Sequence, residues 1–379
     1  MTEVILNTVT ARQLPDPFDS SIKEYSFFVD ARSLPKIGLK ANPRSQHKSK
    51  VWKQIEHSLM EPTIKFHRLN RGLRIMADSV TRGKTNDSWI IKYDEKTQGI
   101  LNGGSTARKI WEMQKKKIPE GKLVKVTVET GLDLKEIIQM AKADNLADPV
   151  PEFTLLNMSG GFDFLKRITK GFPIEICYRQ GDPGIDVRQI LSILALFNPD
   201  FCRTTHDEMF AEKKGTKLFP NNIHHSRNTV LKRFTADPAS FRKFSPEMVS
   251  DILSLYDFLQ VEIRRQVGAK IVKRRYMQSN VQQTLWMEKK TFPNRLPQGF
   301  GYPMAFAASQ YVNTGDTKFS WSVPVPQIRA AYRKALPNML RFIETAARNE
   351  ITPDNFAKKP ANLSNWATMQ NFLKSNLPA

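Results

Sequence analysis

The sequence predicts an α+β protein, in which an α/β N-terminal domain precedes a mainly helical C-terminal domain. Patterns typical of strands and of helices alternate along the first part of the chain, as they do in α/β and α+β domains. A strong turn signal, Gly181-Asp182-Pro183-Gly184, follows, and after it apolar residues recur at helical spacing. We therefore expect three segments: an N-terminal arm at 1–24, an α/β domain at 25–185 and a mainly helical domain at 186–379.

The elements of the first two segments follow from local patterns. Pro15 and Pro17 interrupt the N-terminal arm, which is expected to be irregular. Alternating and β-branched residues predict strands, and 122–129 (KLVKVTVE) is the clearest of them. The other expected strands lie at 24–34, 74–77, 89–93, 100–101 and 174–178. Apolar residues at helical spacing predict helices at 49–60, from the turn at 102–106 to 117, and at 132–145.

The third segment is dominated by helical periodicity. Its first helix is expected at 187–196, and its most periodic stretch is 245–267. Ser245 can cap that helix, and Pro246 suits the first helical position. Beyond Val272, further helices with proline-rich joints are expected.

Composition indicates a globular intracellular protein. Of the 379 residues, 40% are hydrophobic and 25% are charged, which is ordinary for a folded chain. Two cysteines, Cys177 and Cys202, cannot form a disulfide framework, and the first residues lack the basic and apolar regions of a signal peptide. No stretch approaches the roughly 20 apolar residues of a membrane span. We expect a cytoplasmic protein with reduced thiols and no membrane partner.

The net charge is the strongest bulk signal. Lysine and arginine total 58 against 37 acidic residues, giving +21 and an isoelectric point near 9.9. Such a field attracts polyanions, so nucleic acid or a nucleotide is the expected partner. The alternative is that the charge serves only solubility or reflects a basic proteome.

The stretch 98–113, QGILNGGSTARKIWEM, joins a short strand to a helix through two glycines and two hydroxyls. One interpretation is a tight turn in which Ser105 or Thr106 caps the helix. The other is an anion pocket, because N–H groups at a helix N-terminus bind phosphate and glycines allow close approach. The spacing is neither that of a P-loop nor that of a dinucleotide fold. The phosphate-binding candidates here are Asn102, Gly103, Gly104, Ser105, Thr106 and Arg108.

Two further short motifs carry arginines beside turn-forming residues. In Asn42-Pro43-Arg44, proline stiffens a basic loop, so that the Arg44 guanidinium could bind a phosphate with both of its donor edges. Asn70-Arg71-Gly72 precedes the strand at 74–77 and suits a turn. By pattern alone, a solvated loop and a plain turn are the simpler interpretations. We keep Asn42, Arg44, Asn70, Arg71 and Gly72 as candidate phosphate ligands.

A dense basic run, KIVKRRY at 270–276, suits contact with a nucleic-acid backbone, although it could equally be the solvated face of a helix. The candidate nucleic-acid contacts are Lys48, Lys50, Arg264, Lys273, Arg274 and Arg275. Metal and catalytic motifs are absent. Cys202 and His206 with His224-His225 fit no common zinc module, and no nuclease-like carboxylate cluster or nucleophile motif is evident. No metal-ligating residue is therefore predicted, and the sequence identifies no catalytic residue.

The order of these motifs resembles the AIPR family, named for abortive infection phage resistance. That family has an NPR-like element, then F-x-x-N-x-G-I-T-I-x-A, then I-V-N-G-x-Q-T before a helix. The middle element is matched by Phe66, Asn70, Gly72, Leu73, Ile75 and Ala77, and the last by Asn102, Gly103, Gly104 and Thr106. Tyr178-Arg179 with Gly181 resembles a shortened form of a later Y-x-R-x-x-G element. The resemblance covers about 27–191.

More distantly, the same order resembles the ParB and sulfiredoxin-like fold of DGQHR-type proteins, which bind nucleotide phosphates with two comparable boxes. This resemblance implies a ParB-like N-terminal domain in which Arg44 and the turn at 102–106 face the same phosphates. Ser105 stands where AIPR members often have glutamine, and the arginine pair of the partition proteins is missing, with Arg108 further along. These departures weigh more against nucleotide hydrolysis than against anion binding.

We therefore expect an AIPR-like, nucleic-acid-associated protein of bacterial antiphage defence or mobile elements, which binds a nucleotide or a nucleic-acid backbone at the NPR and NGGST motifs. The alternatives are a nucleotide hydrolase or metal-dependent nuclease, and a scaffold or interaction subunit of a defence complex. A nucleoside triphosphate with Mg²⁺ is the candidate cofactor. DNA is a more expected partner than RNA, and other defence proteins or a second copy of the chain are further candidates.

Overall fold

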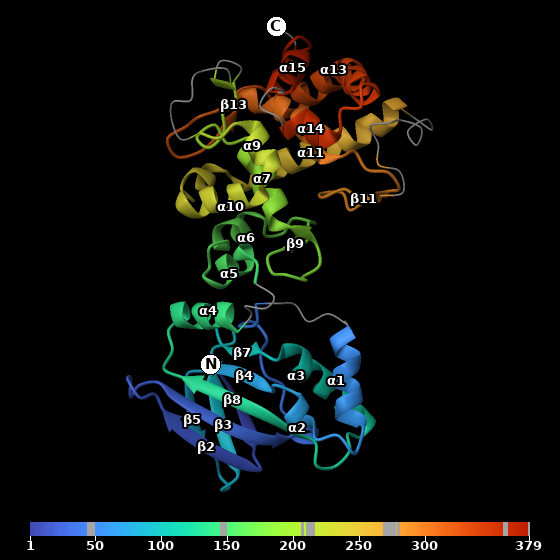
Figure 1. The fold of residues 1–379 in the computed structure, drawn as a ribbon. Helices are drawn as coiled ribbons and strands as arrows, with labels where there is room; N and C mark the ends of the chain where they lie inside the picture. Colours follow the sequence, from blue (N-terminus) through green and yellow to red (C-terminus); the bar gives the residue numbers. More distant parts are fainter. Residues whose placement is uncertain are drawn as a thin grey trace. The chain divides into compact units, whose positions relative to one another are not determined.

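The computed structural model describes residues 1–43, 50–144, 150–205, 208–209, 217–267, 278, 281–358 and 363–377, without the side chains of residues 50, 51 and 267. The chain forms two compact units (Figure 1). The N-terminal unit contains Met1–Gly161 and Cys177–Asp182, and the C-terminal unit contains Phe162–Ile176 and Pro183–Ala379. The first combines strands with helices and the second is mainly helical, which confirms the predicted α+β class.

A five-stranded sheet forms the centre of the N-terminal unit. Its strand order is β2 (Thr10–Pro15), β3 (Lys23–Asp30), β8 (Leu123–Thr130), β4 (Leu73–Ala77) and β7 (Gly99–Asn102). β4 runs parallel to β8, and the other neighbours are antiparallel. The strand with the clearest sequence signal is thus the central one, where β-branched side chains pack against neighbours on both sides.

A second, antiparallel sheet has the order β1 (Thr2–Asn7), β6 (Ser88–Tyr93) and β5 (Ser79–Arg82). The prediction of an irregular arm at 1–24 is wrong, because this segment contains β1 and β2. β1 gains its hydrogen bonds from β6, more than 80 residues away, and local pattern cannot reveal such pairing. Pro15 ends β2, which lies at the sheet edge, where its missing N–H is tolerated.

Four helices of the N-terminal unit lie beside the five-stranded sheet, three of them grouped together and the fourth apart from them (Figure 1). They are α1 (Lys50–Met60), α2 (Phe66–Leu69), α3 (Gly104–Met113) and α4 (Leu134–Ala143), and α5 (Glu152–Met158) follows. Two 3-10 turns, η1 (Ala31–Ser33) and η2 (Gln114–Lys116), lie beside strand and helix ends. Apolar residues of both sheets, α1 and α3 form one continuous core that includes Phe27, Val126 and Ile110.

The two faces of the central sheet have opposite character. Successive side chains of a strand point to opposite faces. On β8, Val124, Val126 and Val128 are buried in the core, whereas Lys125, Thr127 and Glu129 alternate with them on the other face. A small apolar cluster including Met76 and Leu101 joins α4 to one end of that other face. The rest of this face is polar, and the sheet therefore offers a charged floor beside α3.

The C-terminal unit is built from helices around a second core that includes Phe300, Tyr332 and Trp366. The helices of its described part are α6 (Asp163–Ile168), α7 (Val187–Leu196), α9 (Pro220–His225), α10 (Arg227–Ala236), α11 (Pro246–Val267), α12 (Gln298–Phe306), α13 (Val325–Arg348), α14 (Pro353–Lys358) and α15 (Leu363–Lys374), with the 3-10 turns η3 (Ser240–Lys243) and η5 (Ala307–Tyr311). Two short hairpins pair β11 (Gln283–Thr284) with β12 (Thr291–Phe292) and β13 (Val312–Asn313) with β14 (Ser320–Trp321).

The predicted helices at 187–196 and 245–267 are confirmed as α7 and α11. The expected cap is also present, because Met248 N–H donates to Ser245 Oγ at 3.2 Å. The strand expected at 174–178 shrinks to β9 (Ile176–Cys177), and β10 (Ile185–Asp186) is equally short. None of the helices in the described part of the chain has both the length and the apolarity needed to cross a bilayer.

A buried carboxylate ties α11 to the β11–β12 hairpin and should make stability depend on pH. Asp257, only 1% exposed, accepts hydrogen bonds from the N–H groups of Trp286 (2.9 Å) and Met287 (2.6 Å). Burial raises the pKa of Asp257 to about 6. The folded protein therefore binds this proton more tightly than the unfolded chain does. Protonation of Asp257 should increase the free energy of unfolding as pH falls from about 7 to about 4.

We expect Asp257→Asn to abolish this part of the pH dependence. Wild type should gain up to about 3 kcal/mol relative to the variant across that range. Denaturant unfolding of both proteins at a series of pH values measures the difference. A difference that stays constant with pH would contradict the assignment.

Candidate phosphate-binding site

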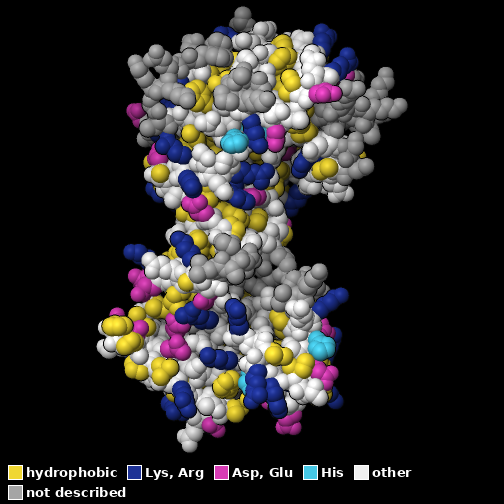
Figure 2. All heavy atoms as spheres, in the orientation of Figure 1, with side chains coloured by type: hydrophobic (Ala, Val, Ile, Leu, Met, Phe, Trp, Pro, Cys, Tyr) yellow, Lys and Arg dark blue, Asp and Glu magenta, His cyan; other side chains and the backbone are white. Residues whose placement is uncertain are grey.

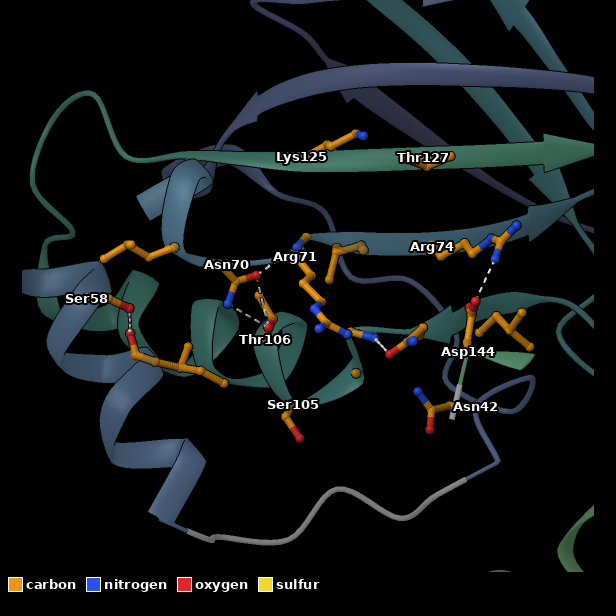
Figure 3. A pocket seen from close by; sticks show the side chains of 18 of the residues that line it. Asn42, Ser58, Asn70, Arg71, Arg74, Ser105, Thr106, Lys125, Thr127 and Asp144 are labelled. Atoms are coloured by element: carbon orange, nitrogen blue, oxygen red, sulfur yellow. Dashed lines mark hydrogen bonds and ion pairs between the residues drawn. The ribbon is translucent and has the colours of Figure 1, made fainter. Parts of the chain in front are cut away.

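A large cavity, of about 1430 Å³, lies on the polar face of the central sheet within the N-terminal unit (Figure 3). Its floor comes from β8 and β4, and its walls come from α1, the turn before β4, the start of α3 and the C-terminal end of α4. Figure 2 shows Lys and Arg side chains spread over the visible face of both units, interspersed with acidic ones. Which ligand the cavity can bind therefore depends on which of its cationic side chains already have a carboxylate partner.

The turn after α2 holds an arginine at the cavity. Asn70 Oδ1 accepts the Gly72 N–H at 2.9 Å, and Asn70 Nδ2 donates to Thr106 Oγ1 at 3.1 Å. Gly72 has φ +82°, and a Cβ there would lie 2.1 Å from the Lys125 carbonyl oxygen. Arg71 is thus fixed between two restrained neighbours, and its side chain extends toward the start of α3 (Figure 3). No carboxylate of the described residues lies within ion-pair distance of it.

The junction of β7 and α3 is the opposite wall. Gly103 is the N-cap of α3 with φ +86°, and no side chain caps the helix. The interpretation that Ser105 or Thr106 caps it is wrong, because the helix already begins at Gly104 and the Thr106 hydroxyl contacts Asn70 instead. The Gly103 N–H donates to Asn102 Oδ1 at 2.7 Å. The first turn of α3, Gly104 to Thr106, therefore lies at the cavity wall.

The cavity floor contains one cation that is paired with carboxylates and one that has no carboxylate partner among the described residues. Arg74 Nε donates to Glu129 at 2.7 Å and Arg74 Nη1 to Asp144 at 2.8 Å, linking β4, β8 and the end of α4. Burial opposes the charge of this guanidinium, but hydrogen bonds and attraction from the two carboxylates outweigh burial and raise the pKa of Arg74. Lys125 lies four residues from Glu129 on the same face of β8, and no described carboxylate pairs with it.

Two buried lysines hold the α1 wall in place. Lys109, 1% exposed, donates to Glu56 at 2.8 Å and lies 4.7 Å from the centre of the Trp52 ring. The Lys109 hydrogen bond lowers the pKa of Glu56. Lys122, equally buried, donates to the carbonyls of Ser58, Glu61 and Ile64, which lie at and beyond the end of α1. Sequence reasoning missed both roles, since a lysine in a basic chain carries no local sign of burial.

The loop before residue 44 is anchored by a distant arginine. Asn42 lines the cavity and is 5% exposed. Arg179 Nη1 donates to the carbonyls of Asn42 (3.2 Å) and Leu39 (3.4 Å), and Arg179 Nη2 pairs with Asp182 at 3.1 Å. The Tyr178-Arg179 element singled out from the sequence therefore positions the start of the NPR loop.

Most of the predicted phosphate ligands come together in this cavity. Its lining includes Asn42, Asn70, Arg71, Gly72, Asn102, Gly103, Gly104, Ser105 and Thr106. Arg108 is exposed on α3, one turn beyond Gly104 and Ser105, and is not among the residues that line the cavity, so the structure does not bring it together with the other candidates. Arg44 falls outside the described residues. Among the cavity cations, sequence reasoning missed Lys53, Arg74 and Lys125.

Of the predicted nucleic-acid contacts, the structure describes the side chain of Arg264 alone. The residues outside the described part of the chain are Lys48, Lys273, Arg274 and Arg275. Lys50 is the first residue of α1, but its side chain is not described. Arg264 is half-buried: its guanidinium donates to the carbonyls of Gln260 and Asn294 and lies 4.3 Å from the Phe292 ring. Burial lowers the pKa of Arg264 to about 10. The geometry makes Arg264 a packing residue between α11 and β12, which argues against its predicted role.

Within the described ranges, no group of three or more His, Cys, Asp or Glu side chains is arranged to hold a metal. Cys202 is fully buried, and burial raises the pKa of its thiol. His206, another member of the sequence-based zinc alternative, lies outside those ranges.

Comparison with known families bears on this geometry. The segment 39–189 matches the AIPR protein family. It contains the Asn70–Gly72 turn, the Asn102–Thr106 junction and Arg179, so the AIPR-matching segment carries most of the cavity. No curated protein and no solved structure gave a significant match. The AIPR resemblance is thereby confirmed over this segment, and the more distant resemblance to the ParB and sulfiredoxin-like fold stays a prediction.

Proposed function

We propose that this chain acts in antiphage defence of the abortive-infection type, and that its N-terminal unit binds a phosphate-bearing ligand in the cavity. The AIPR match supports the first part. The second part is carried by one observation: Arg71 and the uncapped N-terminus of α3 line the same cavity from two sides. Both groups favour an anion, and neither is neutralised by a described carboxylate.

The chemistry of the lining suits phosphate in particular. A guanidinium can donate two parallel hydrogen bonds to two phosphate oxygens. The helix N-terminus adds further N–H donors and a partial positive charge. Lys53 and Lys125 add charge from α1 and β8, again without a described acidic partner. These groups converge from four separate chain segments, as expected of a built site rather than of a solvated surface.

The cavity exceeds the roughly 300–1,000 Å³ typical of small-ligand sites, so it has room for a nucleotide or for part of a nucleic-acid backbone. Mg²⁺ fits the lining poorly. Of its three carboxylates, Glu129 and Asp144 are already engaged by Arg74, which leaves Glu24. We derive no step through a metal, and the proposal is binding rather than hydrolysis.

A second candidate function is a scaffold role, in which the glycines of the cavity serve only the packing of the fold. A Cβ on Gly103 would lie 2.2 Å from the Gly72 carbonyl oxygen, so packing alone requires glycine there. The glycines therefore do not distinguish ligand binding from structure. Arg71 does distinguish the two functions, because its side chain is exposed and no described carboxylate pairs with it.

We expect Arg71→Gln to weaken phosphate binding by at least tenfold. Isothermal titration of the full chain with pyrophosphate, ATP and CTP measures it. Arg68→Gln is the matched control, because Arg68 is an exposed arginine of the neighbouring α2 that does not line the cavity. Plating of phage on cells expressing each variant tests the biological role: protection should fall for Arg71→Gln and persist for Arg68→Gln. Equal behaviour of both variants in both assays would favour the scaffold role.

A further inference from the structure

The long helix α13 has two sharply different faces. Its buried face includes Ile328, Tyr332, Met339 and Ile343. Its exposed face carries Arg333, Lys334, Arg341 and Arg348, and the last three recur every seven residues, or about two helical turns. Glu344 is the single acidic residue of the helix, and it pairs with Arg348 at 3.1 Å. The exposed face therefore presents a strip of positive charge about 22 Å long.

The end of α11 extends this strip. The Glu262 carboxylate, 6% exposed, lies 3.4 Å from Arg265 and also 3.4 Å from Arg333. Gln266 Nε2 donates to the Arg333 carbonyl at 3.2 Å, and the Arg333 guanidinium lies 5.2 Å from the Phe258 ring. One carboxylate thus holds two exposed guanidiniums side by side and cannot neutralise both. We call Arg265, Arg333, Lys334, Arg341 and Arg348 together the α11–α13 basic strip.

The described residues of α11 and α13 expose no large apolar side chain, and this limits the kinds of partner that the strip can bind. The large hydrophobic side chains that the described chain exposes are Met1, Ile5, Val9, Leu14, Phe18, Leu69, Leu134 and Val281, and none is on α11 or α13. A protein partner is normally held by apolar and aromatic residues at the centre of an interface. Insertion into a membrane surface needs an apolar face, and that of α13 is buried. What fits is a polyanion with closely and regularly spaced charges and no need of apolar contact.

We propose that the α11–α13 basic strip binds the sugar–phosphate backbone of a nucleic acid. It lies in the C-terminal unit and does not depend on the N-terminal cavity, all of whose lining residues belong to the other unit. Lys334 and Arg341 have no acidic partner in the described ranges and are the principal contacts. Binding through phosphates alone carries no sequence information, so affinity should depend on salt rather than on sequence.

The test is fluorescence anisotropy with a labelled DNA duplex of about 30 base pairs and an RNA strand of similar length, across a KCl series. The strip variant combines Lys334→Gln, Arg341→Gln and Arg348→Gln, none of which removes the partner of a buried charge. The control variant combines Lys232→Gln, Arg242→Gln and Arg167→Gln, which are exposed in the same unit but outside the strip. Both variants lose the same charge.

We expect the strip variant to lose at least tenfold in affinity, with a salt dependence shallower by about 2–3 charges, while the control keeps the wild-type salt dependence. A charge-keeping variant, Arg341→Lys with Arg348→Lys, should bind like wild type, which separates loss of contact from loss of fold. Equal losses in strip and control variants would overturn the proposal, as would displacement of nucleic acid by polyglutamate at equal charge concentration, which would identify an acidic protein instead.

Discussion

Gly103→Ala is expected to lower the free energy of unfolding by roughly 3 kcal/mol, about half of it through the positive φ and about half through steric conflict. Gly103 has φ +86°, which costs an alanine about 1–2 kcal/mol. A Cβ there would also lie 2.2 Å from the Gly72 carbonyl oxygen and 2.9 Å from Leu73 Cδ2. Backbone cannot rotate away as a side chain can, so β4 and β7 would have to separate. Denaturant unfolding followed by circular dichroism measures the loss.

Gly121→Ala separates the cost of the positive φ from the cost of the steric conflict. Gly121 has φ +77°, nearly the same conformation, but nothing lies within 4 Å of the position that a Cβ would take there. Its replacement should therefore cost only the conformational term, about 1–2 kcal/mol. Similar losses for Gly103→Ala and Gly121→Ala would show that close approach of β4 and β7 contributes nothing.

Arg74→Met should cost a comparable amount, about 3 kcal/mol, because it leaves a buried carboxylate without its cation. Glu129 is 7% exposed, and Arg74 supplies its hydrogen bond at 2.7 Å. Asp144, at the end of α4, loses the same partner. Adding Glu129→Gln to Arg74→Met should restore part of the stability, since a neutral amide is less costly to bury than a charge. Denaturant unfolding of the two single variants and the double variant measures this coupling.

Arg32→Met is the control for the arginine side chain itself. Arg32 makes a similarly close pair with Asp30, at 2.6 Å, but its side chain is 44% exposed. Exposed ion pairs contribute about 1 kcal/mol or less. If Arg32→Met and Arg74→Met were equally destabilising, burial of Glu129 would not be the cause.

Much of the fold could be predicted because its strongest elements have local signals. The alternation in KLVKVTVE indicated the central strand β8, and the Ser245-Pro246 pair marked the start of α11. The strand β1 escaped prediction because its partner β6 is distant in sequence. The strand β2 pairs with β3, which follows it directly, and it was missed because Pro15 and Pro17 suggested an irregular segment. Likewise, Arg264 and Lys109 look like surface cations in the sequence, and only the packing around them shows that they are structural.

The candidate site, like the fold, could be predicted only in part. The sequence identified the Asn70–Gly72 turn and the Asn102–Thr106 junction separately, and the structure joins them through a hydrogen bond between Asn70 and Thr106. The contribution of β8 was missed. Its alternation placed Lys125, Thr127 and Glu129 on one face, and that signal was available in the sequence. What could not be foreseen is which strand lies beside it, because parallel pairing with β4 is not encoded locally.

The most direct test of phosphate binding in the cavity is hydrogen–deuterium exchange of the full chain with and without pyrophosphate. Binding at the proposed site should slow exchange in two segments, 70–74 and 103–107, and leave α13 unchanged. In Arg71→Gln the same addition should give little protection, whereas in Arg68→Gln it should protect as in wild type. Protection confined to other segments, or protection at 103–107 that survives Arg71→Gln undiminished, would contradict the account.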